Sequence, residues 1–93
     1  MIIVSQDKTR IINYDNILQL YISRYIKGAI TEYYIRYEDC NNSYEDIGNY
    51  KTEERAKEVL KEIIEAYRDY RTAECDGYTN VLQETAVFEM PED

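Results

Sequence analysis

The stretch Thr52–Arg71 most constrains the fold of this chain, because it has the clear periodicity of a long helix. Its apolar residues recur at intervals of three and four, the spacing of one helical face. These residues are Ala56, Val59, Leu60, Ile63, Ile64, Tyr67 and Tyr70. Thr52 is a suitable N-cap, and Glu53 and Glu54 follow it where the helix dipole favours negative charge. The sequence therefore predicts a surface helix over residues 52–71 that lays one apolar stripe on a sheet.

Runs with strand character occupy most of the remaining chain. The sequence predicts strands over residues 1–4, 9–14, 17–26, 29–38, 47–51 and 81–90. Lys27-Gly28 indicates a hairpin turn, residues 39–46 a polar loop, and Asp76-Gly77 a turn after the helix. This order predicts one α+β domain over residues 1–93, with a mostly antiparallel sheet of about five or six strands. The helix would pack on one face of that sheet, and a strand would follow it at the C-terminal end.

The acidic residues are concentrated in two stretches of a chain whose net charge is −8. Residues 38–50 hold four acids and residues 73–93 hold six, and neither stretch contains Lys or Arg. Binding to a nucleic-acid backbone needs clustered bases, so direct nucleic-acid binding is disfavoured. An acidic surface instead suits a basic protein partner. The acids predicted to form such a protein-binding surface are Glu38, Asp39, Glu45, Asp46, Glu84 and Glu89.

The two cysteines and the absence of histidine argue against a metal site. Cys40 and Cys75 lie far apart in the sequence, without the spacing of metal ligands, and we expect both thiols to be reduced. No basic segment precedes the apolar residues 1–4, and no apolar run approaches the roughly 18 residues of a membrane span. We expect no cofactor, no membrane association and a cytoplasmic location.

Two groups of acidic residues are candidate sites of chemistry. Asp39, Asn41, Ser43 and Glu45 carry oxygen at alternate positions, as a calcium loop does, but Tyr44 stands where that loop needs glycine. Paired carboxylates could also serve acid–base or two-metal chemistry, and the candidates are Glu32, Glu38, Asp39, Glu45 and Asp46. Nothing in the sequence specifies the pocket that such chemistry needs, so we expect a solvated turn and no enzymatic activity.

A second candidate surface lies on the two central strands. If residues 17–26 and 29–38 pair around Lys27-Gly28, aromatic and basic side chains form one patch. Stacking faces beside guanidinium groups suit a nucleotide or a small phosphate ligand. The residues predicted for this ligand-binding patch are Tyr21, Arg24, Tyr34 and Arg36, with Tyr25 beside them. The simpler interpretation is that they cover the outer face of the sheet or a homodimer seam.

Three segments carry a resemblance to a known family. The opening MIIVSQDKTRIINYDNI, the segment GNYKTEERAKEVLKEIIEAY and the ending FEMPED resemble a family of small uncharacterised proteins. That family occurs in Gram-positive bacteria, their prophages and other mobile elements. The resemblance implies a phage-type context but supplies no catalytic residue. In its size, acidity and α+β character the chain is also similar in type to small anti-CRISPR proteins, which occupy the DNA-binding surface of a nuclease.

The resemblance and the charge pattern together lead to three expectations. The first is a non-enzymatic accessory protein that inhibits a host defence component by binding a basic, nucleic-acid-handling protein through its acidic surface. The second is an oligomeric sponge that sequesters a cyclic nucleotide or a cyclic ADP-ribose-type immune signal with the aromatic and basic patch. The third is a structural or regulatory protein without a defence role. A homodimer or higher oligomer is compatible with each of them.

Overall fold

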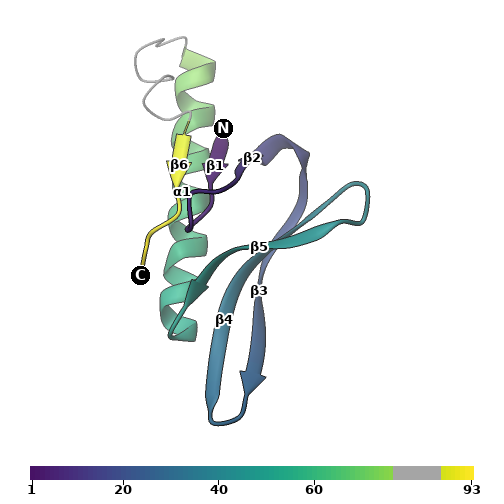
Figure 1. The fold of residues 1–93 in the computed structure, drawn as a ribbon. Helices are drawn as coiled ribbons and strands as arrows, with labels where there is room; N and C mark the ends of the chain where they lie inside the picture. Colours follow the sequence, from purple (N-terminus) through teal and green to yellow (C-terminus); the bar gives the residue numbers. More distant parts are fainter. Residues whose placement is uncertain (77–86) are drawn as a thin grey trace.

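The computed structural model describes residues 1–76 and 87–93 and has the α+β fold that the sequence predicts. Figure 1 shows one long helix beside two groups of strands. In chain order the elements are β1 (Ile2–Val4), β2 (Ile11–Asn13), a 3-10 turn η1 (Tyr14–Asn16), β3 (Ile17–Lys27), β4 (Ile30–Asp39), β5 (Tyr44–Tyr50), α1 (Glu53–Asp76) and β6 (Val87–Glu89). The predicted turn at Asp76-Gly77 and the first part of the predicted strand 81–90 reach into residues outside the described ranges.

The strands form two three-stranded sheets rather than one. The first has the order β2-β1-β6, with β2 antiparallel and β6 parallel to β1. The second has the order β3-β4-β5 and is antiparallel throughout. The chain turns between the sheets at η1, where the Asn13 side chain accepts a hydrogen bond from the backbone N–H of Asp15. Such a side-chain-capped turn ends β2 and starts β3 in a new direction.

Helix α1 begins as predicted and continues beyond Arg71. The Thr52 hydroxyl accepts the N–H of Arg55 at 3.1 Å, which caps the first turn. Ala56, Val59 and Ile63 have no exposed surface and form the centre of the apolar stripe. Ile64 was predicted on the same stripe, but its side chain is 52% exposed. Consecutive residues of a helix point in different directions, so Ile64 points away from the sheets while Ile63 points toward them. The stripe is therefore narrower than the sequence suggests.

The core is a single cluster that α1 shares with both sheets. The described core residues are Met1, Ile3, Ile12, Ile35, Ile47, Tyr50, Ala56, Val59, Ile63 and Met90. Ile3 comes from the central strand of the first sheet and Ile35 from the central strand of the second, and both are fully buried. The Tyr14 ring of η1 also stacks on Tyr67 of α1, with centroids 4.3 Å apart. Burial against α1 thus connects the two sheets.

The polar loop before β5 is shorter than predicted. The sequence places residues 39–46 in a loop, but β5 starts at Tyr44, which pairs with Glu38 of β4. The turn is compact because one carboxylate oxygen of Asp39 accepts the backbone N–H groups of Asn41 and Ser43. Asn42 completes the turn with a φ of 65°, in the left-handed region that asparagine tolerates.

Candidate functional site

The second sheet has a polar, aromatic face. The register places Tyr21 opposite Arg36 and Ser23 opposite Tyr34. Successive side chains of a strand point to opposite faces, so Tyr34 and Arg36 lie on the face opposite to buried Ile35. Three of the four residues predicted for a ligand-binding patch therefore share one face of β3 and β4.

Arg36 is already held by a carboxylate on that face. Its Nε lies 2.8 Å from Oδ1 of Asp46, and its Nη2 lies 3.3 Å from Oδ2. Its guanidinium carbon also lies 5.0 Å from the ring centroid of Tyr44. The hydrogen bond with Asp46 raises the pKa of Arg36. Such a two-point pair fixes the direction of the guanidinium and neutralises much of its charge.

The tyrosines of this face also have partners. The Tyr34 hydroxyl donates to the Glu32 carboxylate, and this hydrogen bond raises the pKa of Tyr34. A shallow hollow of about 490 Å³ lies between these side chains and is lined by Ser23, Arg24, Tyr25, Tyr34, Arg36 and Asp46. The hollow is polar and aromatic, the composition that suits a planar, hydrogen-bonding ligand.

Arg24 is the member of the predicted patch that the structure separates from the others. It lies opposite Tyr33 in the register, so its side chain leaves β3 on the face that carries Ile22 and Ile35. Its Nη2 lies 3.7 Å from a carboxylate oxygen of Glu53 at the start of α1. Arg24 borders the hollow, but its guanidinium is directed to the helix.

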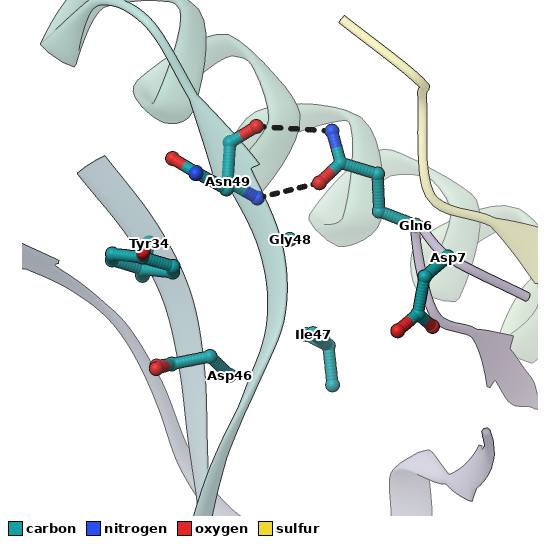
Figure 2. Close-up of a pocket in the computed structure, with 7 residues that line it drawn as sticks. All are labelled: Gln6, Asp7, Tyr34, Asp46, Ile47, Gly48 and Asn49. Atoms are coloured by element: carbon teal, nitrogen blue, oxygen red, sulfur yellow. Dashed lines mark hydrogen bonds between the residues drawn. The ribbon is translucent and has the colours of Figure 1, made fainter. Parts of the chain in front are cut away.

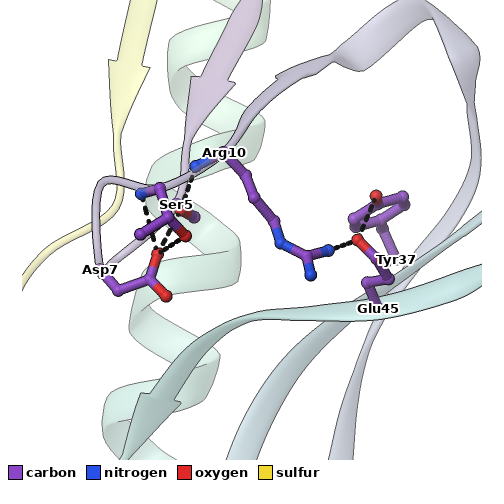
Figure 3. Close-up of polar contacts among 6 residues, drawn as sticks. Ser5, Asp7, Arg10, Tyr37 and Glu45 are labelled. Atoms are coloured by element: carbon purple, nitrogen blue, oxygen red, sulfur yellow. Dashed lines mark hydrogen bonds and ion pairs between the residues drawn. The ribbon is translucent and has the colours of Figure 1, made fainter.

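The two acids of β5 that were predicted to bind a protein partner, Glu45 and Asp46, form ion pairs within the chain. Glu45 pairs with Arg10, and it accepts the Tyr37 hydroxyl at 3.2 Å (Figure 3). Asp46 pairs with Arg36 of the neighbouring strand. These carboxylates connect β5 to the loop before β2 and to β4, so much of their charge is balanced locally.

The remaining predicted acids differ in their surroundings. Glu38 accepts the Gln19 side-chain amide at 2.8 Å, and Asp39 supports the β4–β5 turn. In the part of the chain that the structure describes, neither of them forms an ion pair. Glu89 lies 3.7 Å from the Lys8 ammonium and is 66% exposed. Glu84 lies outside the described residues.

The calcium-loop pattern is a hydrogen-bonded turn in this structure. The Asp39 oxygen that such a loop would direct to the ion accepts two backbone N–H groups instead. Among the side chains of residues 1–72 and 87–93, no group of three or more acids or cysteines is arranged to hold a metal ion.

A second hollow, of about 160 Å³, was not foreseen from the sequence. Figure 2 shows its lining residues, Gln6, Asp7, Tyr34, Asp46, Ile47, Gly48 and Asn49. Gln6 covers the outer edge of β5 there: its backbone N–H donates to Ile47, and its side-chain amide bonds to the backbone of Asn49. The sequence places residues 5–8 between two predicted strands, and no local signal indicates that Gln6 bonds to a residue more than 40 positions away.

The turn that carries Gln6 has its own hydrogen-bond network. Asp7 Oδ1 accepts the Ser5 hydroxyl at 2.7 Å, and the Thr9 hydroxyl and N–H at 2.7 and 3.0 Å (Figure 3). The hydrogen bonds from Thr9 and Ser5 lower the pKa of Asp7 to about 2. The Ser5 hydroxyl in turn accepts the N–H of Arg10, next to the ion pair with Glu45. The network therefore shapes the turn rather than presenting a reactive carboxylate.

The chain was compared with known proteins. No protein family, no curated protein and no solved structure matches it. None of the helices within the described ranges has the length and apolar character needed to cross a membrane. Two candidate sites therefore rest on their geometry alone: the polar face of β3 and β4, and the acidic end of the β4–β5 hairpin.

Proposed function

We propose that this protein is a non-enzymatic binding protein that inhibits a bacterial defence component, and that it contacts a basic, nucleic-acid-handling protein with the acidic end of the β4–β5 hairpin. The observation that carries this proposal is the position of Glu38 and Asp39. Both lie beside the turn, which projects away from α1 (Figure 1), and neither forms an ion pair within the described ranges. Their charge is therefore available to a partner.

In this proposal the acidic residues have different roles. Glu45 and Asp46 are held by Arg10 and Arg36 and maintain the shape of the hairpin. Glu38, which is half-buried and whose carboxylate accepts the Gln19 amide, provides the attraction. Negative charge on a projecting turn competes with nucleic acid for a basic groove, and long-range attraction of this kind weakens as salt screens it.

The test is a charge reversal at Glu38 with a matched control on α1. We expect the unmodified protein to inhibit DNA cleavage by at least one of a panel of purified RNA-guided nucleases, and its affinity for that nuclease to fall with rising salt. Glu38→Lys should weaken binding by about tenfold, since truncating or reversing an interfacial charge costs a kcal/mol or more. The control, Glu65→Lys, adds the same charge at an exposed helical position and should bind normally.

Two results would contradict this proposal. One is a complex whose affinity is the same at low and high salt. The other is equal loss of binding in Glu38→Lys and Glu65→Lys, because net charge alone would then explain the effect. Asp39 is unsuitable for the test, since its carboxylate supports the turn.

A second candidate function is the capture of a nucleotide signal on the polar face of β3 and β4. The hollow beside Tyr34 and Arg36 favours it, because stacking and a guanidinium fork suit a base and a phosphate. The Asp46 carboxylate weakens it, since an anionic ligand would have to displace that partner. A panel of cyclic nucleotides and ADP-ribose derivatives tests it by thermal shift. A ligand at 100 times its Kd should stabilise the protein by about 2.7 kcal/mol, and Arg36→Ala but not Arg68→Ala should abolish the shift.

A further inference from the structure

Strand β3 is an unprotected sheet edge. It has 11 residues and pairs with β4 on one side. Within residues 1–76 and 87–93, no backbone pairs with its other side. An edge of this length presents alternate N–H and C=O groups that can pair with another strand.

The other described edges are short or covered. β2 and β6 have three residues each, and Gln6 bonds to the outer edge of β5. By contrast, β3 contains no proline and no acidic residue, and its bases, Arg24 and Lys27, lie near one end. Proteins usually protect an edge strand with charges, proline or a covering loop. The lack of such protection along most of β3 indicates that another strand covers it.

Two of the three exposed large hydrophobic side chains of β3, Leu18 and Ile26, are placed symmetrically about its centre, and the third, Tyr25, lies on the polar face. Ile22 is the middle residue of the strand, and Leu18 and Ile26 lie four residues on either side of it. Each of these two side chains is 67% exposed. In an antiparallel pair centred on Ile22, the position of Leu18 in one copy lies opposite Ile26 of the other, and this contact occurs twice. Leu18 lies at the irregularity between Ile17 and Gln19, where β3 shifts its register against β4. A strand that complements itself in this way fits a second copy of the same chain.

Charge also favours the antiparallel arrangement. Arg24 and Lys27 lie toward the C-terminal end of β3, while Glu38 and Asp39 lie beside its N-terminal end, opposite Gln19 and Ile17. Antiparallel pairing brings the basic end of one copy to the acidic end of the other, whereas parallel pairing brings like charges together. Complementary charge at both ends of the seam would oppose the repulsion between two chains of net charge −8.

We propose that this protein forms a homodimer by antiparallel pairing of β3 with β3 of a second copy, centred near Ile22. The two second sheets then join into one sheet of order β5-β4-β3-β3-β4-β5. Because paired residues of neighbouring strands point to the same side, both α1 helices lie on one face of the joined sheet. The polar faces that carry Tyr34 and Arg36 form one continuous surface on the opposite face of the joined sheet. This inference does not depend on the proposed function.

The mass in solution tests the dimer, and charge variants test its seam. Light scattering should give twice the chain mass of 11.1 kDa. Leu18→Lys/Ile26→Lys places lysine opposite lysine at both contacts and should weaken dimerisation by about tenfold or more. Leu18→Glu/Ile26→Lys places glutamate opposite lysine and should retain the dimer. The control, Ile11→Lys/Ile64→Lys, adds two lysines at exposed apolar positions elsewhere and should also retain it.

Amide exchange of the unmodified protein provides a test that needs no variant. In the dimer, amides on both sides of β3 should be protected over most of residues 17–27, and the outward-facing ones should lose protection on dilution. A monomer at all concentrations would overturn the proposal. If alternate amides of β3 are then protected from exchange, its outer edge is open. If all of its amides are protected, another segment of the same chain covers that edge. A dimer of equal strength in the lysine double variant would overturn it as well.

Discussion

The side-chain amide of Gln6 bonds to both backbone groups of Asn49. Its Nε2 donates to the Asn49 carbonyl at 3.0 Å, and its Oε1 accepts the Asn49 N–H at 2.7 Å. One amide side chain thereby supplies the donor and acceptor that a neighbouring strand would offer. Nε2 also donates to the Glu92 carbonyl at 2.7 Å, so Gln6 connects the turn after β1 to β5 and to the chain that follows β6.

Replacing Gln6 should therefore destabilise the protein although the residue is polar and near the surface. Gln6→Ala removes three hydrogen bonds that join segments distant in sequence, and we expect a loss of about 1–2 kcal/mol in the free energy of unfolding. Urea unfolding measures this loss. Gln19→Ala is the control: it removes one bond, to Glu38 on the adjacent strand, and should cost less than about 0.5 kcal/mol. Equal effects would show that the contacts of Gln6 have no special role.

Two adjacent isoleucines of α1 should respond very differently to truncation. Ile63 is fully buried, so Ile63→Ala should cost about 2–4 kcal/mol through lost burial and the cavity left behind. Ile64 is 52% exposed, and Ile64→Ala should cost less than about 1 kcal/mol. Chemical unfolding of the two variants compares them directly. Similar losses would mean that the helix presents a different face to the sheets.

The carboxyl group of Asp7 should contribute to stability in a defined pH range. Hydrogen bonds lower its pKa from 3.8 to about 2 in the folded protein, so the folded state favours the ionised form. The contribution is present above about pH 4, where the unfolded chain is also ionised, and is lost as the pH falls toward 2. NMR titration of the Asp7 side-chain carbon measures the pKa. Thr9→Val should raise it, because Thr9 donates through its hydroxyl; an unchanged value would contradict the network.

Gly48 should not tolerate a side chain. A Cβ at this position would lie 2.9 Å from Cε of Met90 and 2.9 Å from Cε2 of Tyr50, and both of those side chains are buried. Gly48→Ala should cost about 1–3 kcal/mol through overpacking, measured by thermal or urea unfolding. Gly28→Asn is the matched control, since its surroundings are open and asparagine tolerates its φ of 62°. If Gly48→Ala left the stability unchanged, the core beside β5 would be able to adjust to the added methyl group.

Local pattern was sufficient to predict most elements of the fold. The three-to-four spacing of apolar residues predicted α1, and runs with strand character predicted β3 and β4. The division into two sheets was not predictable in this way. It depends on pairing of β1 with β6, more than 80 residues away, and on three-residue strands that carry little periodicity.

The candidate surfaces were harder to predict, because they depend on register. The sequence grouped Glu45 and Asp46 with the other acids by their position along the chain. A register shift between Ile35 and Arg36 places Asp46 opposite Arg36, and the turn after β1 brings Arg10 to Glu45. Neither the register shift nor the approach of Arg10 to Glu45 can be inferred from the composition of the sequence. The sequence grouped Arg24 in one patch with Tyr21, but alternation along β3 places the Arg24 side chain on the face of Ile22.

The parallel pairing of β1 with β6 has a consequence for the order in which the structure can form. The sheet of β3, β4 and β5 is made of consecutive hairpins, so its contacts can close early. The sheet of β1 and β2 lacks a partner until residues 87–89 have left the ribosome. During synthesis β1 and β2 emerge before α1, and their sheet gains its third strand only after residues 87–89 have followed the helix.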